Sequence, residues 1–449
     1  MHKSLPETGR EPEEILAELR SFGAKDPDYK HSRVWSLVYY LDAEHEEFLG
    51  KAYQTYVSAN GLNPLAFKSL KKLEDEIISF VSGLLHAPDT AYGVVTSGGT
   101  ESCLLATKTY RDRARALRGV AEPEMIIPTT AHVAWEKGAE YFGLKIRWLP
   151  LTDDLRTDVS GLEGLINDNT AFILGSAPEY PHGTIDPIPV MAEIAARRDV
   201  PMHVDACVGG FILPFMEMNG REISPWDYRV PGVTSISADV HKYGFASKGA
   251  STITYRDLSY FKHQMFVSQN WPGGVFASPA LLGTRPGGAY AAAWAALQYF
   301  GIAGYRDLAA RTTEAVERLS AGIEAIPGLR MLAKPQGPLI AYGSSDVGVN
   351  IFSVGDRMEE RGWSLNRLQL PDGLHGMVTA RHLEVVDRYL ADLAASVEIA
   401  RAHPELAQQG RAAIYGMIAH APYREVVRSQ VLDTFAGYYA THGVKGGGL

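Results

Sequence analysis

Residues 234–256 read TSISADVHKYGFASKGASTITYR, two short strand-like runs joined by a tight loop. The runs at 234–239 and 250–256 are rich in β-branched and small residues, as buried strands are. The loop between them is too short for the helical crossover that joins parallel strands, so we expect the second strand to run antiparallel to the first. This loop also carries His241, Lys242 and Lys248 among small residues, although lysines ordinarily lie on solvated faces.

Further β-branched runs precede this stretch, and helical patterns separate most of them. The expected strands are YGVVTS (92–97), EMIIPTT (124–130), KIRWLPL (145–151), TAFILGS (170–176) and PMHVDA (201–206). Strands that alternate with helices form right-handed crossovers and a mostly parallel sheet covered on both faces. We therefore predict an α/β fold, in which ligands bind at the carboxyl ends of the strands.

The chain is long enough for more than one structural unit. Residues 1–60 show amphipathic helical patterns and no strand pattern, which indicates an N-terminal helical arm or lid. Residues 61–304 hold the predicted sheet and end in an Ala-rich run, 289–305, which is too short to span a membrane and indicates a buried helix. Residues 305–449 have the pattern of a smaller α/β domain with antiparallel strands and a helical tail.

The composition argues against several classes of protein. The 449 residues include 43 Lys and Arg against 52 Asp and Glu, a net charge of −9, which argues against a general nucleic-acid binder. Cys103 and Cys207 are too few for a disulfide framework or a zinc site, so we expect no metal and a reducing, cytoplasmic location. The polar N-terminus lacks the apolar core of a signal peptide.

The segment TSGGTES, 96–102, lies between an expected strand and an expected helix. Its glycines let backbone N–H groups approach a ligand, and its hydroxyls and the helix N-terminus favour an anion such as a phosphate. It lacks the Lys of a nucleotide P-loop, and a simple capped turn is the alternative. The residues that we expect at a phosphate are Ser97, Gly98, Gly99 and Thr100.

Three more polar residues follow expected strand ends. Asp205 ends an apolar strand, so it caps a helix, pairs with an Arg or faces a protonated ring nitrogen. Lys242 is either solvated or an amine in a dry pocket, where a depressed pKa makes it a nucleophile for Schiff-base chemistry. His132 is either an ordinary core or surface histidine or a flat ring that stacks on an aromatic cofactor.

Together these residues are the parts needed to hold pyridoxal 5'-phosphate. The glycine segment takes the phosphate, and His241 lies within reach of it. His132 covers the ring, Asp205 keeps the pyridine nitrogen protonated and Lys242 forms the Schiff base. This prediction rests on the order of these motifs along the chain, because no single one of them is specific for the cofactor.

The same motifs resemble those of a known family. The segments VTSGGTES, HVDACVGGF, GVTSISADVHKYGFASKGAS, ASPALLGTRPGG and GWSLNRLQLP are similar to the sphingosine-1-phosphate lyase family, in the group II decarboxylase-like branch of fold type I pyridoxal-phosphate enzymes. The resemblance covers about residues 35–380. It implies a homodimer with the active site at the subunit interface, and a soluble bacterial-type form without an N-terminal membrane helix. It also implies the cofactor roles given above for Lys242, Asp205 and His132, and a role for Thr284 as a hydroxyl supplied by the neighbouring subunit to the cofactor phosphate.

For the substrate, the resemblance implies that Lys248 and Tyr39 contact a phosphate group. The family carries NPLHP near its lid, with a His thought to assist catalysis, whereas this chain reads NGLNP and places Asn63 there. Asn cannot accept a proton as His does. The base is therefore open, and Tyr180 and Tyr243 are candidates beside a water or the cofactor phosphate.

The reaction implied by the resemblance is a retro-aldol cleavage of sphingosine 1-phosphate or a similar phosphorylated amino alcohol to a fatty aldehyde and phosphoethanolamine. The alternative is α-decarboxylation of an amino acid, as in glutamate or aromatic decarboxylases, with Lys248 on a side-chain carboxylate. A third reading is a non-catalytic cofactor- or lipid-binding protein. The complete set of Lys242, Asp205 and His132 argues against this reading, because binding alone needs no electron sink.

Overall fold

The large unit is built on a seven-stranded sheet with the order β1-β7-β6-β5-β4-β2-β3. A computed structural model of the chain describes residues 4–420 and 424–440, so the ends of the predicted units at 1–3, 421–423 and 441–449 lie outside the described residues. The strands are β1 (Tyr92–Thr96), β2 (Glu124–Pro128), β3 (Lys145–Leu149), β4 (Thr170–Ser176), β5 (Met202–Asp205), β6 (Val233–Ala238) and β7 (Ser251–Tyr255). Each matches a strand predicted from the sequence.

The predicted reversal between the last two strands is confirmed. β7 runs antiparallel to both β6 and β1, with Ser237 opposite Ile253 and Val95 opposite Thr252, whereas the other neighbouring strands are parallel. Since β7 alone is reversed, the carboxyl ends of β1, β2, β4, β5 and β6 lie at one edge of the sheet. The loop from β6 to β7 leaves this edge and carries Lys242.

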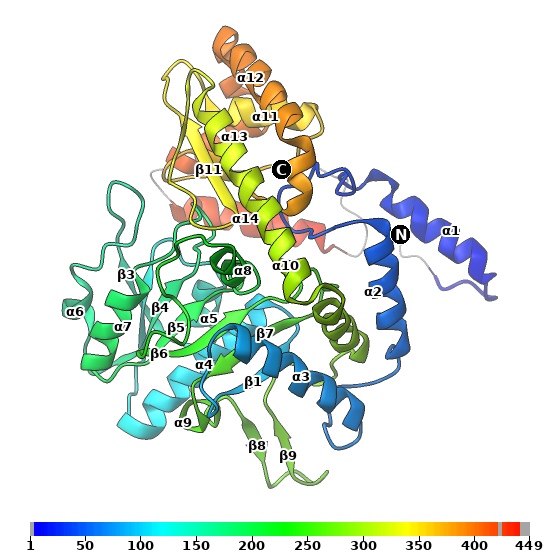
Figure 1. The fold of residues 1–449 in the computed structure, drawn as a ribbon, viewed down its shortest axis with the longest axis vertical. Coiled ribbons are helices and arrows are strands. Elements are labelled where there is room, and N and C mark those ends of the chain that lie inside the picture. The colour runs from blue at the N-terminus through cyan, green and yellow to red at the C-terminus, as the bar shows by residue number, and fades with distance from the viewer. Residues whose placement is uncertain (1–3, 421–423, 441–449) are drawn as a thin grey trace.

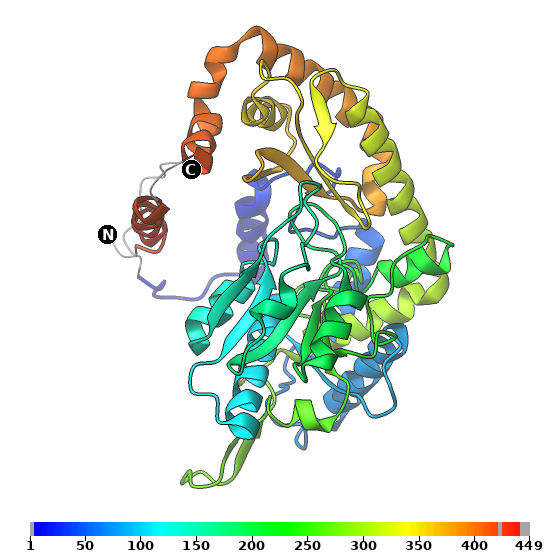
Figure 2. The ribbon, with the colours of Figure 1, turned by 90° about the vertical axis from the view of Figure 1, so that its left-hand side faces the viewer.

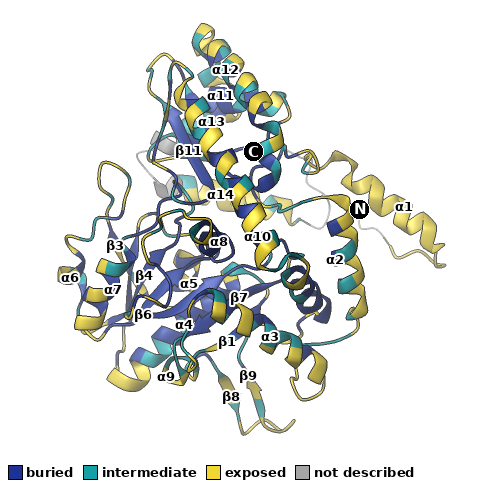
Figure 3. Cartoon of the chain, viewed as in Figure 1, coloured by how far each residue is buried: buried dark blue, intermediate teal, exposed yellow. Residues whose placement is uncertain are grey.

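Helices cover both faces of the sheet (Figures 1 and 2). Along β2, Met125 and Ile127 pack on one side and Ile126 on the other, as the alternation of a strand requires. The first side is covered mainly by α4 (Gly99–Arg118) and α5 (Ala134–Phe142), and the second by α3 (Lys68–Leu84), α7 (Ile188–Arg197), α8 (Leu213–Met218) and the first half of α10 (Gly287–Glu324). The strands between the two edges of the sheet are buried, whereas the edge strand β3 is largely exposed (Figure 3).

Helix α10 connects the large unit to a smaller one. The sequence predicts one helix over 289–305 and another over about 305–326; the structure joins them, with a break at Gly301, whose φ of 53° and ψ of −172° are not helical. Ala residues of the first half, such as Ala292 and Ala296, are fully buried, as predicted for a core helix. Among the described residues, no helix is long and apolar enough to cross a membrane.

The smaller unit contains a four-stranded antiparallel sheet with the order β10-β11-β13-β12. Its strands are β10 (Leu329–Met331), β11 (Leu339–Ser344), β12 (Asn366–Leu368) and β13 (Gly373–Met377), and its helices are α11 (Ile351–Glu360), α12 (Val386–Ala402), α13 (Gly410–His420) and α14 (Arg424–Tyr438). β13, in the centre of the sheet, was not predicted, because GLHGM is short and carries two glycines. The division into units at 60 and 304 stays a prediction.

The N-terminal segment has two parts with different surroundings. Helix α1 (Pro12–Phe22) buries no residue and projects from the body of the protein (Figure 3), whereas α2 (Ala43–Thr55) lies beside α10 (Figure 1). Between them, Trp35 is fully buried in the core of the smaller unit, and Val34 forms a β-bridge with Ser364. The segment predicted as an arm thus supplies a core residue.

The remaining elements are short. They are α6 (Leu162–Leu165), α9 (Leu258–Phe261), the 3₁₀ helices at Gly23–Lys25, Ala380–Val385 and Pro404–Gln408, and the hairpin of β8 (Phe266–Ser268) and β9 (Phe276–Ser278). The hairpin, which the sequence did not predict, projects from the bottom of the large unit in Figure 1. Its apolar residues Phe266, Val267, Trp271 and Val275 are more than half exposed.

Candidate active site

A cavity of about 400 Å³ lies where the strands of the large sheet end. It gathers residues from five connections, those that follow β1, β2, β4, β5 and β6, which is the expected place for a ligand in an open α/β sheet. The predicted site residues in its lining are Ser97, Gly98, Gly99, Thr100, His132, Tyr180, Asp205, His241 and Lys242. The structure thus brings together nine of the residues singled out from the sequence.

Asp205 is held as a buried carboxylate at the end of β5. The indole N–H of Trp135 donates to Oδ2 at 2.9 Å, and the backbone N–H of Cys207 donates to Oδ1 at 3.0 Å. Burial favours the neutral acid, but these two hydrogen bonds outweigh it and lower the pKa of Asp205. The side chain therefore presents a fixed negative charge to the cavity, the property needed opposite a protonated ring nitrogen.

A second layer supports Asp205 from the sheet. Burial lowers the pKa of His203 to about 4, so its ring is neutral, and it lies between the hydroxyls of Ser235 at 2.7 Å and Ser237 at 3.1 Å. Both serines belong to β6, the neighbouring strand. Because the ring of His203 is neutral, no positively charged side chain of the sheet pairs with Asp205. The carboxylate of Asp205 is therefore available to a ligand.

His132 and Tyr180 lie together at another side of the cavity. Burial lowers the pKa of His132, and its Nδ1 accepts the backbone N–H of Ala134 at 3.1 Å, which leaves the hydrogen of the neutral ring on Nε2. The ring centroids of His132 and Tyr180 are 5.8 Å apart. The hydroxyl of Tyr180 accepts a hydrogen bond from Asn366 at 2.9 Å, and burial raises the pKa of Tyr180, so the phenol rests in its neutral form.

Lys242 forms an ion pair that the sequence did not reveal. Its Nζ lies 3.1 Å from Oδ2 of Asp239, a carboxylate that is almost fully buried. Burial by itself would lower the pKa of Lys242, but the charge of Asp239 outweighs it and raises the pKa. The expectation of a depressed pKa for this lysine was therefore wrong, because it considered burial without the neighbouring carboxylate.

The glycine segment after β1 packs against this ion pair. A Cβ on Gly99 would lie 2.8 Å from Oδ2 of Asp239 and 3.0 Å from Sγ of Cys207, so only glycine fits. The backbone N–H of Ser97 donates to Oε2 of Glu101 at 2.7 Å, and Oε1 accepts the N–H of Leu281 at 3.0 Å. Glu101 thus ties the segment to the loop that precedes α10, a role that the sequence pattern did not indicate.

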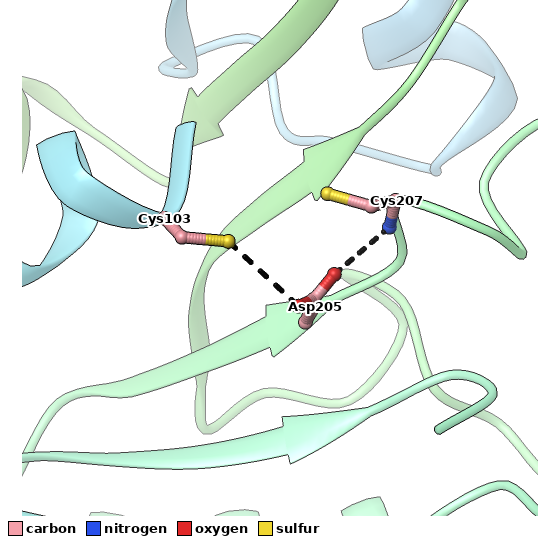
Figure 4. Close-up of side chains that lie close together, drawn as sticks. All are labelled: Cys103, Asp205 and Cys207. Carbon is pink, nitrogen blue, oxygen red and sulfur yellow. Dashed lines mark hydrogen bonds between the residues drawn. The ribbon is translucent and has the colours of Figure 1, made fainter. Parts of the chain in front are cut away.

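Two thiols flank Asp205 (Figure 4). Sγ of Cys103 lies 3.8 Å from Oδ2 of Asp205, and Sγ of Cys207 lies 3.4 Å from the hydroxyl of Ser237. Burial raises the pKa of Cys103 to about 11, and the hydrogen bond with Cys103 together with burial raises the pKa of Cys207. Both thiols are therefore neutral near pH 7 and pack around the carboxylate.

Tyr39, Tyr243 and Lys248 border the cavity without lining it. The hydroxyl of Tyr243 donates to the carbonyl of Val378 at 2.8 Å, and its ring lies 5.1 Å from that of Tyr39. Nζ of Lys248 lies 3.2 Å from the carbonyl of His241 and 4.8 Å from the ring centroid of Tyr39. Burial lowers the pKa of Lys248 to about 8, although the residue keeps an exposed surface.

Asn63 and Thr284 are not brought to the cavity of their own chain. Oδ1 of Asn63 accepts the backbone N–H of Leu65 at 2.9 Å, and the hydroxyl of Thr284 accepts from Asn60 at 3.2 Å. Both residues are exposed. Their predicted roles toward a ligand stay predictions.

Of the lining residues that the sequence did not single out, Asp239 and Glu101 matter most. Asp239 directly precedes Val240, His241 and Lys242 at the end of a buried strand, and a charged residue at such a place was a usable signal. Glu101 had no comparable signal, because an acidic residue in the first turn of a helix is ordinary. Its burial depends on the distant loop at Leu281.

Comparison with known proteins places this site in a family. The pyridoxal-dependent decarboxylase conserved domain matches residues 47–344. A sphingosine-1-phosphate lyase of Oryza sativa is 41% identical over 428 residues, which cover 94% of this chain and 79% of that protein. The chain belongs to the sphingosine-1-phosphate lyase family.

Other members and neighbours agree with this placement. A sphingosine-1-phosphate lyase structure from Burkholderia pseudomallei superposes with a TM-score of 0.87 at 38% identity and covers 96% of this chain and 97% of that one. A glutamate decarboxylase structure from Lactobacillus brevis, at a TM-score of 0.78 and 23% identity, shares the fold. As a member of the lyase family, the protein is a fold type I, pyridoxal-phosphate-dependent lyase.

The residues in the cavity fit this cofactor. Asp205 supplies a buried anion for the pyridine nitrogen, and Lys242 supplies an amine beside the glycine segment. The second carboxylate oxygen of Asp239, Oδ1, is buried and has no hydrogen-bond partner among the described residues. Such an atom beside a lysine and a glycine turn indicates a site whose polar groups are completed by a bound molecule.

Proposed function

We propose that the protein cleaves sphingosine 1-phosphate, or a similar phosphorylated amino alcohol, into a fatty aldehyde and phosphoethanolamine. The observation that carries this proposal is the position of Lys248. Its ammonium lies beside Tyr39 and the backbone of His241, at the border of the cavity that holds Lys242. A cation beside the cavity of Lys242 suits a substrate with its own phosphate. An ion contact near a protein surface is worth a few kcal/mol (about 4 at an effective dielectric of 20) before desolvation.

The cofactor, when bound, supplies an electron sink that accepts the electron pair of the bond that breaks. We propose that Lys242 anchors it through a Schiff base and that the glycine segment and His241 hold its phosphate. In this scheme Asp205 maintains the positive charge of the pyridine nitrogen, because its own pKa is lowered and its charge has no other cation nearby in the sheet. His132 contributes a flat neutral ring at the side of the cavity.

The chain must also move two protons. The C3 hydroxyl of the substrate loses its proton as the C2–C3 bond breaks, and C2 gains one after the aldehyde forms. We propose that Lys242 returns the proton to C2, since its raised pKa keeps the free amine protonated. Tyr180 lines the cavity and its phenol is neutral, so we propose that it orients the C3 hydroxyl by a hydrogen bond while a water or the cofactor phosphate accepts the proton. Tyr243 is engaged by the carbonyl of Val378.

We further propose that the working form is a homodimer in the cytoplasm. Thr284 is exposed and lies outside the cavity of its own chain, which agrees with a role in the neighbouring subunit. The exposed apolar hairpin of β8 and β9 precedes it in the sequence and offers surface for an interface. The two cysteines are free and buried, as is usual in a reducing compartment.

One assay separates this function from its alternative. The purified holoenzyme is incubated with a sphingoid-base phosphate and, separately, with a panel of amino acids that includes glutamate and aromatic residues. We expect release of a long-chain aldehyde from the phosphate and no carbon dioxide from the amino acids. Carbon dioxide without aldehyde would overturn the proposal in favour of amino-acid decarboxylation.

A further inference from the structure

Two buried thiols, those of Cys103 and Cys207, take no part in the proposed reaction. Cys103 belongs to α4, Asp205 ends β5, and Cys207 lies in the turn that follows this strand (Figure 4). All three side chains are buried and line the cavity of the candidate active site. The two cysteines are far apart in the sequence, so only the fold shows that both thiols meet at one carboxylate.

The donor atoms of these three side chains converge. One ligand atom from each residue lies within 4.8 Å of the other two, and Sγ of Cys103 is 3.8 Å from Oδ2 of Asp205. In a tetrahedral zinc site, with bonds of about 2.3 Å to sulfur and about 2.1 Å to oxygen, neighbouring sulfur and oxygen ligands are about 3.6 Å apart. In the part of the chain that the structure describes, this is the one group of three potential metal ligands with such spacing.

The charge of the cavity also favours a cation. The charged side chains in its lining are three carboxylates, those of Glu101, Asp205 and Asp239, and one ammonium, that of Lys242. A Cβ on Gly99 would lie 3.0 Å from Sγ of Cys207 and 3.0 Å from Oδ1 of Asp239, so this second carboxylate adjoins the thiols. Oδ1 is buried and has no hydrogen-bond partner among the described residues. A divalent cation would offset this excess of buried negative charge.

We propose that Cys103, Asp205 and Cys207 bind a thiophilic divalent cation, Zn²⁺ or Cd²⁺, and that this cation and the cofactor exclude one another. Two sulfur ligands select a soft cation over Mg²⁺ or Ca²⁺, which prefer oxygen. The cation takes the place of the two thiol protons, which pass to the solvent. The fourth ligand of a tetrahedral site is then a water molecule in the cavity.

The exclusion depends on Asp205. Under the proposed function its carboxylate faces the pyridine nitrogen of the cofactor, whereas in the cation complex it is a metal ligand. A carboxylate neutralised by a divalent cation no longer favours a protonated ring nitrogen beside it. The exclusion therefore rests on the proposed cofactor role of Asp205, but the cation site does not.

Titration of the full-length apoenzyme with CdCl₂ tests the cation site. The chain contains two cysteines, so the ultraviolet charge-transfer absorption of cadmium–thiolate bonds reports on Cys103 and Cys207 alone. We expect one Cd²⁺ per chain with this absorption. In Cys103→Ser and Cys207→Ser the Kd of Cd²⁺ should rise about tenfold or more, because each variant loses a thiolate ligand.

Thr107→Ser is the matched control. Thr107 is fully buried one turn after Cys103 on α4, and its hydroxyl donates to the carbonyl of Cys103 at 2.8 Å. Serine keeps this hydroxyl and all three metal ligands, so the Kd of Cd²⁺ should stay unchanged.

The exclusion is measured as the Kd of pyridoxal 5'-phosphate, by equilibrium dialysis with and without Cd²⁺. At a Cd²⁺ concentration about ten times its own Kd, competition predicts that the apparent Kd of the cofactor rises about tenfold in wild type and Thr107→Ser. At the same concentration the rise should be much smaller in the two Cys→Ser variants. Each protein is compared with itself without Cd²⁺, so a direct effect of the substitution on cofactor binding cancels.

The wild-type titrations decide the question even if a Cys→Ser variant does not fold. Absence of cadmium–thiolate absorption in the folded apoenzyme overturns the cation site, as does a Kd of Cd²⁺ that neither Cys→Ser substitution changes. An unchanged Kd of the cofactor at saturating Cd²⁺ overturns the exclusion. None of these measurements uses the substrate, so a failure to release aldehyde rejects the lyase function and leaves the cation site standing.

Discussion

Lys242, Asp205 and His132 could be predicted as a group because each follows a strand, and the ends of parallel strands meet at one edge of the sheet. Their surroundings could not be predicted in the same way. The ion pair between Lys242 and Asp239 depends on the turn after β6, which brings the two side chains to 3.1 Å. The sequence shows that the residues are near neighbours but not that one reverses the pKa shift of the other.

Asp239 gives a prediction at this scale. Because its charge raises the pKa of Lys242, Asp239→Asn should increase the fraction of neutral amine at a given pH, by about tenfold for each unit that the pKa falls. The pH above which apoenzyme takes up the cofactor rapidly should move down, measured by stopped-flow absorbance. Asp227→Asn removes a buried carboxylate that pairs with Arg229 and is the control. An unchanged profile in Asp239→Asn would show that the ion pair does not govern the amine.

Lys248 gives a pH-dependence. Its pKa is lowered from 10.5 to about 8, so the cation is present below this pH and is lost as the pH rises through it. The value of kcat/KM for a phosphorylated substrate should therefore fall about tenfold per pH unit above about 8. Arginine keeps its positive charge over this pH range, so in Lys248→Arg the fall in kcat/KM should begin at a higher pH. If kcat/KM of the Arg variant falls at the same pH as that of the wild type, a group other than Lys248 causes the fall.

At the scale of elements, the seven strands of the large sheet could be predicted because each is a compact β-branched run between helical patterns. β8, β9 and β13 could not: the first two are short and exposed, and the third is rich in glycine, so none has the pattern of a buried strand. The break in α10 at Gly301 could not be predicted from the sequence either, because a single glycine in an Ala-rich run does not show which φ it adopts.

The glycine segment at the start of α4 gives the prediction at this scale. Gly99→Ala places a Cβ 2.8 Å from the Asp239 carboxylate, whereas the Cβ of Gly98→Ala meets Cε1 of His241 at an ordinary 3.5 Å. We expect the Kd of the cofactor to rise about tenfold or more in Gly99→Ala, since overpacking costs about 1–3 kcal/mol, and to rise less in Gly98→Ala. Equal effects of the two variants, measured by equilibrium dialysis, would show that close packing of Gly99 is not the constraint.

For the whole molecule, the α/β class and the small unit with antiparallel strands could be predicted from the order of patterns along the chain. The burial of Trp35 in the smaller unit could not, because a Trp among polar and aromatic residues near the N-terminus does not reveal which distant core it joins. The same limit applies to Tyr39 and Lys248, whose proximity depends on the packing of the N-terminal segment on the β6–β7 loop.

The proposed homodimer yields a prediction at this scale. Lys242→Ala and Thr284→Trp should each be inactive alone, the second because a bulky residue replaces a small hydroxyl at the proposed phosphate contact. If Thr284 acts in the neighbouring subunit, mixed dimers contain one site with both native residues, so co-expression should restore activity. If the mixture stays inactive although mixed dimers are isolated by two affinity tags, Thr284 does not act across the interface.

The central claim is that Lys242 carries the cofactor. Borohydride reduction of the holoenzyme, followed by peptide mass spectrometry, tests it most directly. We predict a reduced cofactor adduct on the peptide that contains Lys242, and neither this adduct nor visible cofactor absorption in Lys242→Ala. An adduct on a different lysine of the wild type, or one that persists in Lys242→Ala, would contradict the account.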